Sequence, residues 1–313
     1  MLETSQPSLR QEQHPLIHRL AERIINYWHK YLDLSNYSLP DGLGYVEGKL
    51  EGERLRIENR CYQTPQFRKM HLELAKVGKN LDILHCVMFP HPSYPLPVFG
   101  CDIVASKNGV SAAIADLSPT SPEKTLSSDY VSSLSKLPKT KFSEVRDLPS
   151  WADIFSDFCL FVRPHDAEEE QHFLDLASSY LRIHCQQANK ASVLSARQQQ
   201  LYLDRQQYYC IKQRQNDKTR RVLEKAFGSE WADNYMNSVL FDVPDLGSNS
   251  ALKQDAISIV KDTPAQKVIS EADTSSADSL ERRASPEAAV CDTATHEASG
   301  RHHVFLANEQ TTL

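Results

Sequence analysis

Leu-Asp-Ile-Leu-His-Cys-Val-Met-Phe, residues 81–89, belongs to the most apolar part of the chain, yet His85 interrupts this strand-like run. A similar run at 70–75 contains Glu73, and another at 98–104 contains Asp102. An ionisable group in a half-buried strand costs stability unless it is paired or used. Three such groups so close together in the sequence indicate a set of proton-handling side chains that face one cavity.

The alternation of side chains along a strand sorts these candidates by face. Glu73 shares a face with His71, while His85 points away from Asp82. If the three runs are neighbouring strands, one register brings Glu73, His85 and Asp102 to the same side of the sheet. Other registers separate them, and the sequence does not decide between these possibilities.

Each candidate also has a plainer interpretation. His85 can be a core histidine with satisfied hydrogen bonds, and Glu73 or His71 can be solvated at a strand end. Asp102 is harder to explain in this way, because lone carboxylates are rarely buried. Together, a histidine that titrates near neutrality and a carboxyl group that burial keeps protonated are suited to acid–base chemistry.

The hydrophobic period changes at Gly44, from helical spacing that starts near Pro15 to strand-like alternation. Six short strands joined by turns are expected at 45–50, 55–60, 66–76, 81–89, 97–105 and 109–117. Such short connections favour a largely antiparallel sheet.

A connector rich in Ser, Pro and Lys runs from Pro119 to about residue 147. Helices are expected after it at 148–158, 166–188, 194–217 and 218–241. A sheet with helices before and after it predicts an α/β sandwich in a single domain.

These changes of pattern divide the 313 residues into three parts. Residues 1–14 are expected to be a flexible N-terminus, and residues 15–243 to be the folded domain. Residues 244–313, rich in Ser, Ala, Thr and acidic residues, are expected to be a disordered tail, with a short helix around 279–290 as the alternative.

Several classes of protein are disfavoured by composition and motifs. No apolar run is long enough to span a membrane, and the N-terminus lacks the pattern of a signal peptide. The seven cysteines are scattered without a CxxC pair, which argues against a disulfide scaffold and a metal or iron–sulfur site, and favours a reducing cytoplasm. Nucleotide-binding glycine motifs and a P-loop are missing, so the chain is expected to bring no nucleotide, flavin or metal of its own.

One stretch, residues 186–226, is strongly basic, with 9 Lys and Arg against 3 Asp and Glu. A solvated helix face is one interpretation. The other is a docking surface for an acidic partner or for anionic groups of a substrate. RNA binding is less favoured, because few aromatic residues are interleaved with the basic ones.

Five segments resemble the ferredoxin-dependent bilin reductases, at 58–73, 84–90, 99–102, 113–119 and 216–228. The likeness covers roughly residues 15–243. It implies a three-layer α/β/α sandwich with a central, largely antiparallel six-stranded sheet flanked by helices.

The resemblance also implies that biliverdin IXα binds between the sheet and the C-terminal helices. Its four-electron reduction to phycocyanobilin would proceed through bilin radicals, with the exovinyl group reduced before the A-ring. Reduced [2Fe-2S] ferredoxin, a transient electrostatic partner, would supply the electrons to a monomeric enzyme with no bound cofactor and no nucleic-acid or membrane partner. A sibling reductase with different double-bond selectivity and a non-catalytic bilin carrier are the alternatives.

The same resemblance assigns roles to residues. Asp102 would protonate the bilin with His85 beside it, and Glu73 would serve the exovinyl reduction with His71 as a supporting neighbour. The remaining expected substrate-binding residues are Arg146 and Lys218 for the propionates, Ser111 to assist them, and Asn216 and Val222 in the pocket lining. His85 favours the branch of the family that forms phycocyanobilin.

Overall fold

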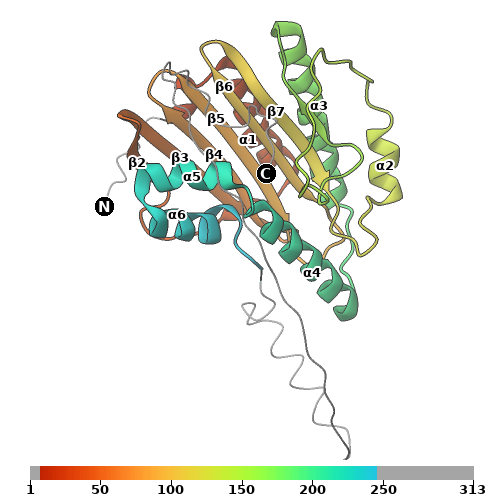
Figure 1. The fold of residues 1–313 in the computed structure, drawn as a ribbon. Helices are drawn as coiled ribbons and strands as arrows, with labels where there is room; N and C mark the ends of the chain where they lie inside the picture. Colours follow the sequence, from red (N-terminus) through yellow and green to blue (C-terminus); the bar gives the residue numbers. More distant parts are fainter. Residues whose placement is uncertain (1–7, 245–313) are drawn as a thin grey trace, which may run out of the picture. The chain divides into compact units, whose positions relative to one another are not determined.

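The computed structural model describes residues 8–244. Its centre is an antiparallel sheet with strands in the order β1-β3-β4-β5-β6-β7-β8, and β2 pairs with β3 (Figure 1). The long strands are β2 (Tyr45–Leu50), β3 (Glu53–Gln63), β4 (Phe67–Val77), β5 (Leu81–Pro90), β6 (Val98–Ser106) and β7 (Gly109–Ser118). These confirm the six expected strands. Two short strands, β1 (Ser35–Asn36) and β8 (Leu160–Val162), extend the sheet.

Helices cover both faces of this sheet and confirm the three-layer α/β/α arrangement (Figure 1). One layer contains α1 (Pro15–Tyr31), α2 (Ser128–Leu134) and α3 (Ala167–Ala188). The other contains α4 (Ala196–Gln213), α5 (Asp217–Phe227), α6 (Ser229–Tyr235) and a π-helical turn at Met236–Leu240. Among residues 8–244, no helix is both long and apolar enough to cross a membrane.

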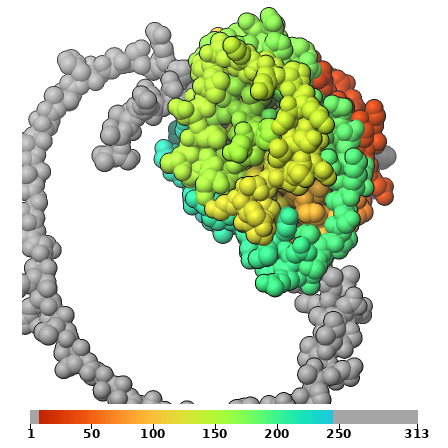
Figure 2. Space-filling view, turned by 90° about the vertical axis from the view of Figure 1, so that its right-hand side faces the viewer, coloured from red at the N-terminus to blue at the C-terminus, as the bar shows by residue number. Residues whose placement is uncertain are grey.

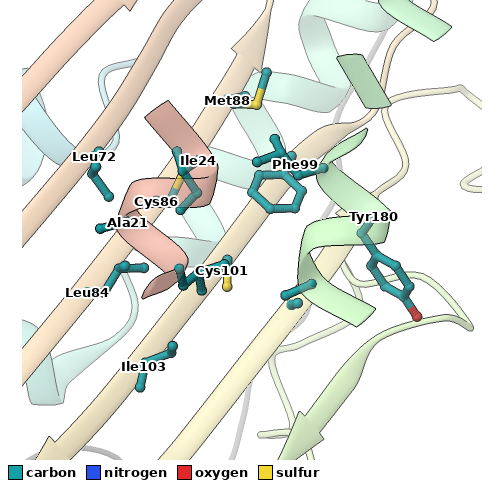
Figure 3. Close-up of a cluster of buried hydrophobic side chains, with 14 of the residues drawn as sticks. Ala21, Ile24, Leu72, Leu84, Cys86, Met88, Phe99, Cys101, Ile103 and Tyr180 are labelled. Carbon is teal, nitrogen blue, oxygen red and sulfur yellow. The ribbon is translucent and has the colours of Figure 1, made fainter. Parts of the chain in front are cut away.

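The first layer is held by a largely apolar core. Leu72, Leu84, Cys86, Cys101 and Ile103 point from the middle strands towards Ala21 and Ile24 of α1 (Figure 3). Because side chains alternate along a strand, the residues between these apolar ones face the other helical layer. The core on one side therefore determines which side chains reach the opposite face.

Two of the expected helices differ from the structure. Residues 148–158 form turns, because the buried carboxylate of Asp116 accepts hydrogen bonds from Ser156 N at 3.1 Å and Ser156 Oγ at 2.5 Å. The expected helix at 218–241 is divided at Gly228, whose φ of 91° lies in the left-handed region. The chain turns there, and α6 folds back onto the sheet.

The expected flexible N-terminus is wrong for residues 8–14. Leu9–Glu12 form a 3-10 helix, and the Leu9 side chain is completely buried. The Leu9 amide donates to Glu58 Oε2 at 2.6 Å, and the His14 amide donates to Asp82 Oδ2 at 2.7 Å. Residues 1–7, and the expected tail apart from Pro244, lie outside the described residues.

A glycine allows α5 to approach the sheet. A Cβ atom at Gly48 in β2 would lie 2.3 Å from Cε1 of Phe227, the last residue of α5. The Phe227 ring has little room to retreat, because its centroid lies 4.2 Å from that of Trp231. Gly48 thus determines where α5 sits over the sheet.

We expect Gly48→Ala to lower the free energy of unfolding by about 1 kcal/mol, the lower end of the usual cost of overpacking, since Phe227 is only half-buried. Gly44→Ala is the matched control, because a Cβ there meets no atom within 4 Å. Chemical denaturation of both variants measures the difference. Equal stability of the two would show that Gly48 does not limit the approach of α5.

Candidate functional site

The strand register places the three ionisable candidates in one row. Glu73 of β4 lies opposite His85 of β5, and His85 lies opposite Asp102 of β6. Residues directly opposite each other on neighbouring strands share a face of the sheet. Of the registers that the sequence permits, the structure has the one that brings Glu73, His85 and Asp102 together.

This row forms part of the wall of a cavity of about 1210 Å³. The other walls are the loop at 144–155, the beginning of α5, and the segment from Tyr235 to Phe241. Figure 2 shows the molecule from the right-hand side of Figure 1, where the segments between β7 and α3, yellow to light green, lie on the surface beside α4. The volume exceeds the usual range for small-molecule sites, about 300–1000 Å³, and indicates a large ligand.

Most of the expected substrate-binding residues also line this cavity. Arg146 comes from the 144–155 loop, while Asn216, Lys218 and Val222 come from the beginning of α5. Asn216 is the N-cap of that helix, and its Oδ1 accepts from the Lys218 amide at 3.2 Å. The positive end of the α5 dipole and the cationic side chains of Arg146 and Lys218 therefore all border the cavity.

Two expected residues, Ser111 and His71, are not among the residues that line this cavity. The Ser111 hydroxyl donates to the Val104 carbonyl at 3.1 Å. The Ser111 backbone carbonyl accepts a hydrogen bond from Arg146 Nη1 at 2.8 Å, so Ser111 contacts an expected substrate-binding residue through its main chain. His71 is completely buried, and burial lowers its pKa well below the ordinary value, so the ring is neutral. Its centroid lies 5.9 Å from that of His85.

His85 and Asp102 form a tight pair, with 2.5 Å between His85 Nδ1 and Asp102 Oδ1. Burial alone would lower the pKa of His85, but the charge of Asp102 and this hydrogen bond outweigh burial, so the pKa is raised. Since Nδ1 is engaged, Nε2 is the ring nitrogen left for a ligand. Among residues 8–244, this buried Nε2 has no hydrogen-bonding partner.

Glu73 has a different environment. The residue is only 9% exposed, and its Oε2 lies 2.7 Å from the hydroxyl of Tyr235. Burial raises the pKa of Glu73, against the opposing effects of His85 and Tyr235. The row thus has an imidazole paired with a carboxylate at one end and, at the other, a carboxyl group whose pKa is raised by burial.

A largely buried ion cluster lies next to Phe241, which lines the cavity. Lys69 donates to the Val239 carbonyl at 2.7 Å and is paired with Asp242, to which Arg68 Nη1 also donates at 2.5 Å. These bonds hold Phe241 against the sheet, with its ring centroid 5.8 Å from that of His85.

Sequence reasoning missed Asn59, Tyr235 and the aromatic residues Trp151, Phe155 and Phe241. Asn59 carried a usable signal, because it is a polar residue at an inward position of a strand. The others did not, since nothing in the local pattern shows that the 148–158 turns and the segment after Gly228 reach the sheet. Within residues 8–244, no cluster of His, Cys, Asp and Glu side chains is arranged to hold a metal ion.

Comparison with known proteins places this geometry in context. The sequence profile described as ferredoxin-dependent bilin reductase matches residues 21–242. The chain is 55% identical over 246 residues to phycocyanobilin:ferredoxin oxidoreductase of Synechococcus elongatus, covering 78% of this chain and 99% of the relative. It is 56% identical over 245 residues to the protein of the same name from Trichodesmium erythraeum, covering 78% and 100%.

A solved structure shares the fold. The crystal structure of tomato phytochromobilin synthase in complex with biliverdin matches with a TM-score of 0.61 at 14% identity, covering 72% of this chain and 84% of the other. At this identity the likeness concerns the fold.

We expect Asp102→Asn to lower the pKa of His85, because the amide removes the negative charge and leaves burial as the dominant effect. An NMR titration of the His85 ring in the substrate-free protein measures this pKa. Because the folded-state pKa is raised, the pair stabilises the fold at lower pH, and this contribution is lost as the pH rises through that pKa.

The matched control is Asp153→Asn, which removes a carboxylate paired with Lys212 rather than with His85. That variant should leave the His85 titration unchanged. An unchanged His85 pKa in Asp102→Asn would contradict the assignment of the raised pKa to Asp102.

Proposed function

The chain belongs to the ferredoxin-dependent bilin reductase family, and we propose from this that it reduces biliverdin IXα to phycocyanobilin with four electrons from reduced [2Fe-2S] ferredoxin. The observation that carries the proposal is the row of Glu73, His85 and Asp102 on one wall of a large cavity. Identity of about 55% to relatives named phycocyanobilin:ferredoxin oxidoreductase supports this product over that of a sibling reductase.

The dimensions of the row suit a linear tetrapyrrole. Neighbouring strands lie about 4.8 Å apart, so Glu73 and Asp102, two strands apart, are separated by about 10 Å across the sheet. One extended pigment lying against the sheet can therefore meet both groups. Arg146 and Lys218, at another part of the cavity wall, are suited to pair with its two propionates.

The protein's contribution to the reaction is the supply of protons. Each electron that the bilin accepts makes it more basic, and a proton must follow for the reduction to proceed. We assign Asp102 to the protonation of the bilin, with His85 holding a second proton through their shared hydrogen bond. Glu73 donates at the exovinyl group, which is reduced first, and the A-ring follows.

His71 and Ser111 act indirectly in this proposal. His71 lies on the same face of the sheet as Glu73 and supports the row from beside His85. The Ser111 carbonyl orients the Arg146 guanidinium, which also lies over the Phe161 ring at 5.6 Å. Asn216 and Val222 shape the wall beside the propionates.

The test is an anaerobic assay with biliverdin, reduced ferredoxin and product absorption spectra. The parent protein should yield phycocyanobilin. Glu73→Gln and Asp102→Asn should still bind biliverdin but slow proton-coupled reduction by about 100-fold or more, because general acid catalysis typically contributes that much. Glu73→Gln should leave the exovinyl group unreduced.

Glu168→Gln, at the start of α3 on the opposite face of the sheet, is the control and should behave as the parent. A different reduced bilin from the parent would indicate a sibling reductase, and binding without turnover would indicate a carrier. Parent-like turnover in Asp102→Asn would remove that residue from the mechanism.

Ferredoxin docking generates a separate prediction. The basic stretch at 186–226 spans α4 and α5, although three of its cations are paired with acids outside it, Lys212 with Asp153, Arg220 with Asp233 and Lys225 with Glu51. The net charge of the stretch stays positive and favours an acidic partner. Steady-state kcat/KM for ferredoxin should therefore fall as ionic strength rises.

Arg197→Gln, at an exposed position of α4, should weaken this salt dependence. Arg182→Gln, on α3 in the other helical layer, is the matched control and should not. Rates that stay constant across ionic strength would argue against electrostatic docking by this stretch.

A further inference from the structure

Asn59 occupies the place next to Glu73 in the row, opposite it on β3. The residue is 8% exposed, and its Nδ2 donates to the Leu43 carbonyl at 2.7 Å. A carbonyl oxygen can only accept a hydrogen bond, so the amide nitrogen must face Leu43. This contact fixes the orientation of the amide and turns Oδ1 towards the site.

Asn59 Oδ1 has two close neighbours. His71 Nε2 lies 2.8 Å from it, and Tyr235 Oη lies 2.9 Å from it. An amide oxygen carries no hydrogen, so both neighbours must donate. His71 is therefore the tautomer with hydrogen on Nε2, and the Tyr235 hydroxyl points its hydrogen at Asn59.

Tyr235 has one hydrogen and two partners, because its Oη also lies 2.7 Å from Glu73 Oε2. With that hydrogen directed at Asn59, the contact with Glu73 is a hydrogen bond only if Glu73 carries a proton and donates it to Tyr235. An ionised Glu73 would force Tyr235 to turn, and two oxygen lone pairs would then face each other at the Asn59 contact. Of the two arrangements, only the neutral one makes all three contacts hydrogen bonds: His71 with Asn59, Tyr235 with Asn59, and Glu73 with Tyr235.

We propose that Asn59 is a positioning residue that, through Tyr235, keeps Glu73 protonated in the substrate-free protein. The cavity wall then carries a proton that can be transferred to a substrate. The use of that proton rests on the function proposed above. The protonation itself does not, since it follows from the hydrogen-bonding capacities of four buried side chains.

The charges around Glu73 are compatible with this arrangement. The titratable groups that face it are His85 and Asp102 on the sheet, Tyr235 on α6 and Cys61 on β3. Burial raises the pKa of Cys61 to about 12, so the thiol is neutral and adds no charge. Burial raises the pKa of Glu73, the charge of His85 lowers it, and the charge of Asp102 raises it again. The Tyr235 bond that would also lower it is withdrawn when Tyr235 donates to Asn59.

The same chain explains how Glu73 can release its proton. The Glu73 O–H bond breaks as the hydrogen forms a bond with the reduced substrate, leaving a carboxylate. Tyr235 then rotates its hydroxyl from Asn59 to that carboxylate and stabilises it. Asn59 keeps the bond from His71, so the buried amide oxygen is never left without a donor.

Carbon NMR of protein labelled at the glutamate carboxyl carbon, without biliverdin or ferredoxin, tests the inference, with Glu73→Gln to assign the signal. Glu73 should be neutral at pH 7 in the parent. Asn59→Leu frees Tyr235 to donate to the carboxylate, so the proton affinity of Glu73 should fall by roughly tenfold.

A double-mutant cycle separates this effect from a general structural one. In the Tyr235→Phe background, Asn59→Leu should leave the Glu73 titration unchanged, because the hydroxyl through which it acts is gone. A shift that persists without the Tyr235 hydroxyl, or an ionised Glu73 at pH 7 in the parent, would overturn the inference.

The parent protein supplies a readout even if Asn59→Leu does not fold. Nitrogen NMR of labelled histidine should show His71 with hydrogen on Nε2 and a bare Nδ1, and the opposite tautomer would contradict the assignment. A neutral Glu73 in a protein without reductase activity would contradict only the proposed function. An ionised Glu73 in an active reductase would contradict only this inference.

Discussion

Two hydrogen-bonded ladders, β4–β5 and β5–β6, set Glu73 opposite His85 and His85 opposite Asp102. The site depends on this register, because a slip of one residue would turn every side chain of a strand to the other face. The slip would also move apolar residues such as Leu84 out of the core beneath α1 and α3. Burial of the apolar face therefore maintains the row of ionisable groups on the opposite face.

The row is costly to maintain, since ionisable groups in a sheet lose hydration. Each is compensated differently: His85 by the Asp102 carboxylate, and Glu73 by its hydrogen bond with the Tyr235 hydroxyl. The second helical layer covers the cavity on the side opposite the sheet. The Lys69–Asp242 pair holds the end of this layer, directly after the π-helical turn, against the sheet. The apolar cores on both sides provide the stability that a partly polar cavity wall requires.

Much of this arrangement could be predicted from the sequence. Alternation identified the six long strands and the faces of Glu73, His85 and Asp102, because period two is a local property. Register was left open, since several pairings satisfy the same alternation. Tyr235 could not be assigned to the site, because it reaches Glu73 across 162 positions of sequence and only after the chain turns at Gly228. The 148–158 segment was mistaken for a helix, because its pattern does not reveal that Asp116 takes the Ser156 amide.

The central claim is that one pigment lies against the sheet face that carries the three groups. A crystal structure of the protein with biliverdin bound tests this most directly. The account predicts a pigment in the cavity of about 1210 Å³, in contact with Glu73, His85 and Asp102, with its propionates towards Arg146 and Lys218. Biliverdin seated elsewhere, for example in the smaller cavity of about 450 Å³ beside α2, would contradict it.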